Sequence, residues 1–288
     1  MGSLPSGTGS VSGGTYAFRE CGERVILDVS RPSVARMYDH LLGGTDNYQV
    51  DREACEKLLR LAPSSRELAL VNRAFLGRAV RYLAREQGVR RFLDHGSGLP
   101  TRPNVHQVAQ EVDPASEVVY IDNDPVVLAH GEIMLAEDPR TTAVLNADIR
   151  DTTKIFESGA VRRLLRDDQP VAALFVSVLH CIPDDDDPWE LVRRVCQQLP
   201  RDSCLVISQL ASDDPELRRS TTDFMQEITH NTWGTVRSYS EVDRFFEGHD
   251  VLVTPEPVEV SRWLPDSELV PRQRSKEWVQ YGGVARIG

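Results

Sequence analysis

The sequence contains 288 residues, of which 40% are hydrophobic, and this length and composition indicate a soluble globular protein with a sizeable core. The formal net charge is −11, from 44 acidic and 33 basic residues, so a nucleic-acid partner is disfavoured because the phosphate backbone requires positive potential. The longest strongly apolar run, VAALFVSVL at residues 171–179, is far shorter than the roughly 18 residues of a membrane-spanning helix.

The cysteines and the acidic run give no sign of a metal site. Five cysteines are widely spaced without a CxxC pair, which predicts neither a zinc site nor a disulfide framework and favours a cytoplasmic location. Residues 184–187 are four consecutive aspartates, which cannot all converge on one ion. We therefore interpret this run as a solvated loop and expect no metal.

The N-terminal part is predicted to be helical after a leader. Residues 1–24 begin with a Gly- and Ser-rich stretch without the basic and apolar regions of a secretory signal, and we expect a flexible leader there. Residues 30–44 carry Val34, Met37 and Leu41 at helical spacing and end in two glycines. A second helix is predicted within residues 66–88, so residues 25–88 are expected to form a helical cap or lid.

From residue 89 onward, strand-like and helix-like segments alternate. Strands are predicted within residues 89–95, 117–124, 142–148, 171–180 and 203–210, and helices within 102–112, 125–137, 152–165, 187–199 and from 213. This alternation is typical of an α/β fold with a parallel sheet covered on both faces. Residues 250–263 and 276–288 read as two strands without an intervening helix, so the sheet is expected to end antiparallel.

The stretch FLDHGSGLPT, residues 92–101, places Asp94, Gly96 and Gly98 after a predicted strand. Open α/β sheets bind nucleotide-like ligands at such a turn. A dinucleotide fingerprint needs a third small residue where this sequence has Thr101, which disfavours NAD. The loop also has no Lys, which disfavours a phosphate-binding P-loop. A plain structural turn would also explain the glycines.

Two further strand ends also carry acids. Asp122 ends the next predicted strand, where a carboxylate can accept hydrogen bonds from ribose hydroxyls. Asp148 follows the third strand, where a short polar side chain can meet an adenine amino group. Together the three strand ends predict a nucleoside-type cofactor, and the alternative is that these acids are solvent-facing loop residues.

Several longer stretches carry a family resemblance. They are SVARMYDHLLGGTDNYQVDREACEKLL, VNRAFLGRAVRYLA, FLDHGSGLPTRPNVHQVAQ, VVYIDNDPVVLAH and SVLHCIPDDDDP. From about Asp28 onward, the sequence resembles the actinobacterial S-adenosylmethionine-dependent methyltransferase family that was once catalogued as a domain of unknown function. The resemblance implies the class I methyltransferase fold, a Rossmann-like domain over residues 89–288 with seven strands, the last one antiparallel.

The resemblance also implies S-adenosyl-L-methionine as the cofactor and assigns residues to its parts. The loop of Asp94, Gly96 and Gly98 would hold the methionine half, Asp122 the ribose with Asn123 beside it, and Asp148 with Ile149 the adenine. His95 and Ser97 depart from the DIGTGLPT loop common in the family. We interpret His95 as a tolerated substitution that points away from the ligand, with altered chemistry or regulation as the alternative.

Residues in three further segments are candidates for cofactor contacts. The turn GGTDNY at residues 43–48 is expected to close over the cofactor, with Asp46 or Asn47 reaching its amino-acid end. Arg73 interrupts an apolar helical pattern and can pair with the cofactor carboxylate or with a surface acid. Thr101 begins the segment before the next helix, whose N-terminal N–H groups favour an anion.

Methyl transfer requires that the nucleophile, the methyl carbon and the leaving sulfur lie in line and that water is excluded. Acid–base chemistry is less important, because the sulfonium is already activated. A general base is needed only for a neutral hydroxyl or a protonated amine. His180, Tyr38 and His40 are the candidate catalytic residues. We expect the acceptor pocket near them, between the N-terminal helices and the carboxyl ends of the fourth and fifth strands.

The predicted function is methyl transfer to a small-molecule acceptor, and the resemblance alone suggests specialised metabolism. The alternative is a protein of the same fold that binds the cofactor without transferring methyl, either a ligand-sensing regulator or a cyclase or rearrangement enzyme that uses the sulfonium electrostatically. The fold by itself does not separate these functions. The sequence also leaves open the acceptor, the atom methylated and the oligomeric state.

Overall fold

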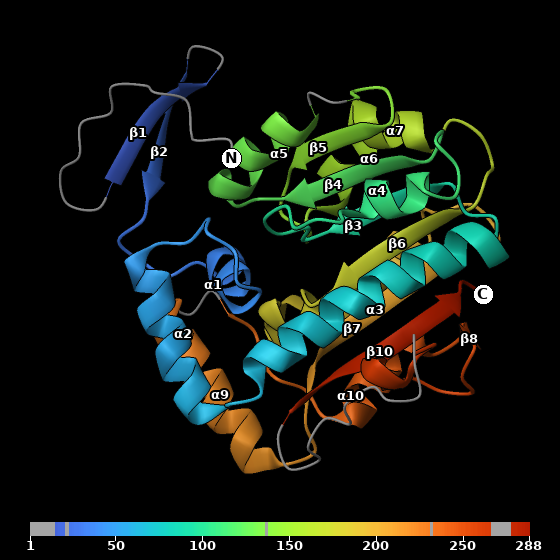
Figure 1. Cartoon of the computed structure of the whole chain (residues 1–288). Helices are drawn as coiled ribbons and strands as arrows, with labels where there is room; N and C mark the ends of the chain where they lie inside the picture. Colours follow the sequence, from blue (N-terminus) through green and yellow to red (C-terminus); the bar gives the residue numbers. More distant parts are fainter. Residues whose placement is uncertain (1–14, 21–22, 136–137, 231–232, 266–277) are drawn as a thin grey trace.

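The computed structural model describes residues 15–20, 23–135, 138–230, 233–265 and 278–288. A sheet in the order β5-β4-β3-β6-β7-β10-β8, with β9 paired to β10, forms its centre (Figure 1). The strands are β3 (Arg91–His95), β4 (Glu117–Asp122), β5 (Thr142–Asn146), β6 (Val171–Val176), β7 (Cys204–Ala211), β8 (Asp250–Leu252), β9 (Val258–Glu259) and β10 (Val279–Arg286).

The pairing confirms a parallel sheet with an antiparallel end. Strands β3 to β7 run parallel to one another, whereas β10 is antiparallel to β7 and to β8. The strand expected over residues 250–263 is divided into β8 and β9. Between them Val253 has a φ of 78°, and prolines at 255 and 257 offer no N–H for strand pairing.

Helices cover both faces of the sheet. One face packs against α3 (Ser65–Glu86), α4 (Val105–Gln110) and α5 (Pro125–Leu135), and the other against α6 (Thr152–Glu157), α7 (Gly159–Leu164), α8 (Pro188–Cys196) and α10 (Tyr239–Asp243). Burial on both faces explains why the β6 segment is a continuous apolar run rather than an alternating one.

A separate apolar cluster joins α1 (Val34–Leu41) and α2 (Gln49–Leu61) to α9 (Pro215–Ile228), which follows β7. In Figure 1, α9 lies beside α2. A buried ion pair between Arg36 Nε and Asp51 Oδ2, 2.8 Å apart, ties α1 to α2. The cap expected over residues 25–88 includes α2, whereas α9 comes from outside that range and most of α3 packs on the sheet.

The expected leader is only partly covered by the structure, since residues 1–14 lie outside the described residues. After them, β1 (Thr15–Glu20) and β2 (Glu23–Asp28) pair as an antiparallel hairpin, which the sequence analysis did not predict. No helix within the described ranges is long and apolar enough to cross a membrane.

The aspartate run at residues 184–187 is exposed and also makes structural contacts. Asp184 Oδ1 lies 2.6 Å from Nη2 of Arg237, whose side chain is 1% exposed, and Arg237 also donates to the carbonyls of Leu179 and Ile182. Asp187 accepts from the backbone N–H of Glu190 and caps α8. All four aspartates are exposed, as expected for a solvated loop, and Asp184 and Asp187 in addition anchor the chain that follows β6.

Candidate functional site

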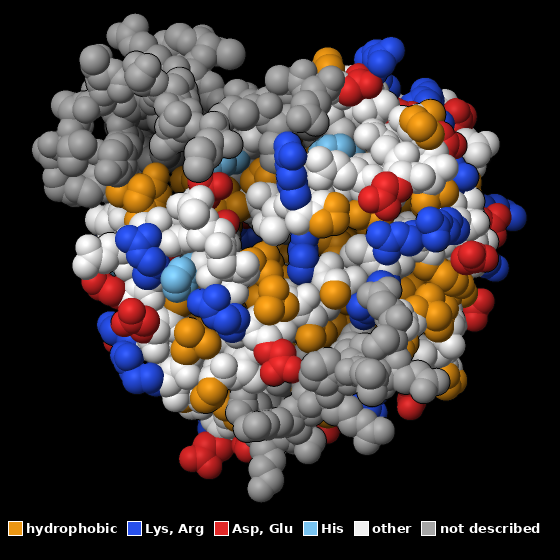
Figure 2. All heavy atoms as spheres, viewed as in Figure 1, with side chains coloured by type: hydrophobic (Ala, Val, Ile, Leu, Met, Phe, Trp, Pro, Cys, Tyr) orange, Lys and Arg blue, Asp and Glu red, His pale blue; other side chains and the backbone are white. Residues whose placement is uncertain are grey.

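A cavity of about 540 Å³ opens at the carboxyl ends of the parallel strands, next to α1 and α3. Figure 2 shows this face hollowed, with hydrophobic and basic side chains visible in the hollow. Ligands in open α/β sheets bind at this edge, where the strand order reverses between β3 and β6. The predicted site residues that line it are Tyr38, Arg73, Asp94, Gly96, Gly98, Thr101, Asp122, Asn123, Asp148, Ile149 and His180.

The glycine loop leaves room for a ligand. Gly96 and Gly98 have φ angles of 70° and 65°, in the left-handed region that favours glycine. A Cβ on Gly96 would lie 2.3 Å from Cγ2 of Val178, whereas a Cβ on Gly98 would meet no atom within 4 Å. The backbone at Gly98 therefore borders open space, as a loop that holds a cofactor requires.

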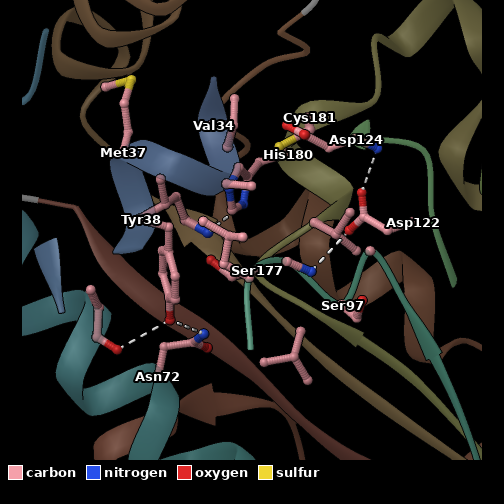
Figure 3. Close-up of a pocket in the computed structure, with 18 of the residues that line it drawn as sticks. Val34, Met37, Tyr38, Asn72, Ser97, Asp122, Asp124, Ser177, His180 and Cys181 are labelled. Carbon is pink, nitrogen blue, oxygen red and sulfur yellow. Dashed lines mark hydrogen bonds between the residues drawn. The ribbon is translucent and has the colours of Figure 1, made fainter. Parts of the chain in front are cut away.

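Asp122 lies at the centre of the cofactor side of the cavity (Figure 3). Its Oδ2 accepts from the backbone N–H of Gly98 and its Oδ1 from that of Asp124, both at 2.9 Å. Burial raises the pKa of Asp122, and these backbone hydrogen bonds oppose the rise. A carboxylate has about four lone-pair sites, so two remain for hydroxyl donors of a ribose.

Asp148 is held by a neighbouring cation that the sequence analysis missed. Arg150 donates from its backbone N–H and from Nε to Asp148 Oδ1, each at 2.9 Å, and these bonds hold the pKa of Asp148 below its usual range. Asn123 Nδ2 reaches Asp148 Oδ2 at 3.5 Å. The end of β5 thus presents a fixed carboxylate beside the buried side chain of Ile149.

Asp94 and Arg73 place opposite charges on the methionine side of the expected cofactor position. Burial raises the pKa of Asp94 to about 7, Arg73 lowers it, and the charge of Asp122 raises it further. Arg73 Nη2 donates to the carbonyl oxygens of Thr101 and Pro103, which fixes its guanidinium over the loop. A carboxylate and a guanidinium so placed match the ammonium and carboxylate of an amino-acid group.

His95, next to Asp94, faces the opposite side of the sheet. Its ring is fully buried and stacks on Phe175, with centroids 4.3 Å apart, and it does not line the cavity. Burial lowers the pKa of His95 to about 4, so the ring is neutral at physiological pH. Because successive strand residues point to opposite faces, this placement agrees with a substitution that points away from the ligand.

Tyr38 lines the cavity, but its hydroxyl group is already engaged (Figure 3). Tyr38 Oη accepts from Asn72 Nδ2 at 2.9 Å and donates to the carbonyl of Ala69 at 3.2 Å. Asn72 Oδ1 accepts in turn from Ser208 Oγ at 2.5 Å, and burial raises the pKa of Tyr38. Tyr38 is therefore a fixed wall of the cavity and a poor proton acceptor.

His180 follows β6 and also faces the cavity. Its Nδ1 accepts the backbone N–H of Leu210 at 3.2 Å, and its ring packs against Trp233 with centroids 4.8 Å apart. Burial, together with the charge of Arg237, lowers the pKa of His180 to about 3. In this neutral tautomer Nε2 carries the proton, so His180 presents a hydrogen-bond donor to the cavity and its Nδ1 is occupied.

Two predicted site residues do not line the cavity. His40 lies in the last turn of α1. Asn47 donates to Asp39 Oδ2 at 2.8 Å and to the carbonyl of Gly44 at 3.0 Å, while its Oδ1 accepts from Arg52. The Asn47 side chain holds the turn at residues 43–48 closed and does not face the cavity, and the expected roles of both residues stay predictions.

Other cavity residues were missed by the sequence analysis. Ser33 Oγ donates to Asp124 Oδ2 at 2.6 Å and connects the start of α1 to the end of β4, a contact without a local sequence signal. Gln280 lines the cavity from β10, and a polar residue in that apolar strand was a usable signal. Among the described residues, no group of three or more His, Cys, Asp or Glu side chains could hold a metal ion.

Comparisons with known proteins give a consistent result. Residues 21–288 match a family model described as S-adenosyl methyltransferase. The structure is similar to a DUF574 family protein from Streptomyces avermitilis MA-4680, with 36% identity over 91% of this chain and 99% of that chain and a TM-score of 0.84. It is also similar to a proposed methyltransferase from Thermobifida fusca YX, with 37% identity over 90% and 96% of the two chains and a TM-score of 0.83. No curated protein matches the chain.

Proposed function

The chain belongs to the S-adenosyl methyltransferase family, and from this premise we propose that it methylates a small molecule bound between α1 and the ends of β6 and β7. S-adenosyl-L-methionine is its cofactor, and its fold is the class I methyltransferase fold. The observation that carries the proposal is one continuous cavity, which joins three acid-bearing strand ends to an apolar space beneath the N-terminal helices.

We assign the cofactor side by the chemistry of each residue. Asp122 accepts the ribose hydroxyls with Asn123 beside it, while Asp148 and Ile149 frame the adenine. Asp94 pairs with the ammonium group and Arg73 with the carboxylate, over the loop of Gly96, Gly98 and Thr101. The free space at Gly98 and the opposite charges of Asp94 and Arg73 support this assignment.

The bound cofactor supplies a methyl group on a positively charged sulfur, which needs no further activation. The residues of the chain orient the acceptor and exclude water. Tyr38 forms a fixed aromatic wall, and His180 donates a hydrogen bond from Nε2 to the acceptor. Neither residue removes a proton in this proposal, and His40 has no direct role. The engaged Tyr38 hydroxyl and the occupied His180 Nδ1 support this division.

The cellular setting is also part of the proposal. We place the enzyme in the cytoplasm, where structural disulfides are rare. The four cysteines in the described part of the chain, Cys55, Cys181, Cys196 and Cys204, are free, which supports this placement. A role in specialised metabolism is suggested only by the family resemblance.

A labelling experiment tests methyl transfer directly. The protein is incubated with S-adenosylmethionine bearing a deuterated methyl group and with a cell extract freed of macromolecules, and the products are identified by mass spectrometry. We expect one labelled small molecule together with S-adenosylhomocysteine. The variant Asp122→Ala should lose this product, whereas Asp185→Ala, at an exposed position of the aspartate run, should retain it.

The outcome also separates the two functional classes. Recovery of bound, still methylated cofactor with no labelled small molecule would support a cofactor-binding protein without methyl transfer. Saturable binding of NAD, with no response to S-adenosylmethionine or S-adenosylhomocysteine, would contradict the roles assigned to the strand-end residues.

A further inference from the structure

The part of the cavity enclosed by α1, α2, α3 and α9, which we call the inner chamber, is apolar. Met37, Leu58, Leu68, Met225, Trp233 and Trp278 line it and belong to the same buried cluster. Together they leave a pocket with an aromatic lining beyond the strand ends that hold the cofactor. Such a pocket suits a ring-containing molecule, because aromatic side chains favour stacked or edge-on contacts with other rings.

The charged residues that line the cavity within the described part of the chain are not members of the apolar cluster around the inner chamber. Asp94, Asp122, Asp124 and Asp148 lie at or just after the carboxyl ends of strands, and Arg150 pairs with Asp148. The guanidinium of Arg73 is fixed by the carbonyls of Thr101 and Pro103.

Asp39, on α1, accepts from the backbone N–H of Asp46 and from Asn47, and so faces the turn at residues 43–48. Among the residues that the structure describes, none supplies a counter-charge inside the inner chamber, so an ion there would lose its hydration without compensation from them, which is strongly unfavourable.

Three lining side chains have buried polar atoms without a hydrogen-bond partner among the described residues. They are the indole N–H groups of Trp233 and Trp278 and the Oε1 of Gln280, in side chains that are 3%, 2% and 2% exposed, respectively. Gln280 Nε2 donates to Ser177 Oγ at 3.1 Å, which fixes the orientation of the amide.

Buried polar groups in native proteins are normally paired, and an unpaired one is destabilising. The two indoles require a hydrogen-bond acceptor such as a carbonyl oxygen, and Gln280 Oε1 requires an N–H or O–H donor. His180 adds a ring and one further donor at the edge of the chamber.

We propose that the inner chamber selects an uncharged, planar ring compound that carries both a carbonyl group and an N–H or O–H group, as in a lactam. This inference rests on the proposed function, because it takes the molecule in the chamber to be the methyl acceptor. Stacking on the tryptophans provides contact area, and the unpartnered polar atoms fix the orientation of the ring.

Three bicyclic probes of similar size test the proposal on the full chain saturated with S-adenosylhomocysteine. They are 2-quinolinone, an uncharged lactam, quinoline-2-carboxylate, an anion, and N-methylquinolinium, a cation. Their dissociation constants are measured by calorimetry. We expect 2-quinolinone to bind at least tenfold more tightly than either ion, and equal binding of either ion would overturn the proposal.

Matched variants identify the atoms responsible. Gln280→Glu keeps the shape of the side chain and adds a negative charge. It should therefore weaken the binding of 2-quinolinone and strengthen the binding of N-methylquinolinium. Trp278→Phe and Trp233→Phe keep a ring but remove one N–H each, and each should weaken 2-quinolinone about three- to tenfold. Leu70→Gln, at an exposed position on α3, is the control and should change nothing.

The readouts keep the two proposals separate. If the protein does not bind S-adenosylhomocysteine, the cofactor site fails and the proposed function fails with it. If it binds S-adenosylhomocysteine but the probes show no preference, or if both Phe variants bind 2-quinolinone as the original chain does, only the inner-chamber inference is refuted. Should Gln280→Glu fail to fold, the two Phe variants carry the test.

Discussion

Replacing Asp122 with alanine is expected to weaken binding of S-adenosylhomocysteine by about 1.5–3 kcal/mol, the range for hydrogen bonds to a charged group. In the folded chain each carboxylate oxygen accepts one backbone N–H, from Gly98 or Asp124. Two lone-pair sites remain for the ribose hydroxyls. The predicted loss corresponds to an increase in Kd of roughly 10- to 150-fold.

The variant Asp122→Asn separates charge from shape. An amide has only one acceptor oxygen, and its NH2 group would face one of the two backbone N–H groups that Asp122 now accepts. The glycine loop would then lose a hydrogen bond at Gly98 or Asp124 in addition to the contact with the ribose. We therefore expect Asp122→Asn to bind the cofactor nearly as weakly as Asp122→Ala.

Calorimetric titration of each folded variant with S-adenosylhomocysteine measures this effect. Asp185→Ala is the matched control, since it removes an exposed carboxylate from the loop after β6. Urea unfolding of all variants checks that the change in Kd does not reflect loss of the fold. A Kd for Asp122→Ala within twofold of the original chain, or an equal change in Asp185→Ala, would refute the placement of the ribose at the end of β4.

Three further predictions follow from the ionisable groups. Burial raises the pKa of Asp94 to about 7, and pairing with the cofactor ammonium requires the ionised form. Affinity should therefore be about half of its maximum near pH 7, approach the maximum roughly one pH unit higher, and fall by up to tenfold per pH unit below pH 7. Calorimetry between pH 5.5 and 8.5 measures this slope, which Asp94→Asn should abolish. His180→Ala should leave cofactor affinity within a few-fold and lower single-turnover methyl transfer by less than about 10²-fold, because a neutral ring with an occupied Nδ1 orients the acceptor without removing a proton. A larger loss would restore a general-base role. Asp184→Ala should lower the free energy of unfolding in urea by about 1–3 kcal/mol, since it leaves buried Arg237 without its carboxylate, whereas Asp185→Ala should stay within about 0.5 kcal/mol of the original chain. The range given for Asp184→Ala allows for solvent screening, because the Asp184 side chain is half exposed. Equal free energies of unfolding for the two variants would contradict this prediction.

The sequence by itself determined the sheet and the cofactor edge. The local periodicity of apolar residues distinguishes strand segments from helix segments, and the two kinds of segment alternate along the chain. Parallel strands bring their carboxyl ends to one edge of the sheet. The acids near the end of β3, at the end of β4 and after β5 could therefore be placed together from their positions in the sequence. The period-two geometry of a strand also accounts for His95 facing away from Asp94.

The tertiary structure decided the cap and the chemistry of the candidate acceptor site. α9 joins α1 and α2 although more than 150 residues of sequence separate them, and no local pattern specifies such a partner. The pairing of Arg237 with Asp184 and the capture of His180 Nδ1 by the Leu210 N–H are likewise long-range. These long-range contacts bury the side chains of the site, and burial shifts their pKa values and so determines which protonation state each side chain adopts. Residue types alone therefore suggested a histidine base, whereas the folded chain holds a neutral hydrogen-bond donor at the edge of an apolar chamber.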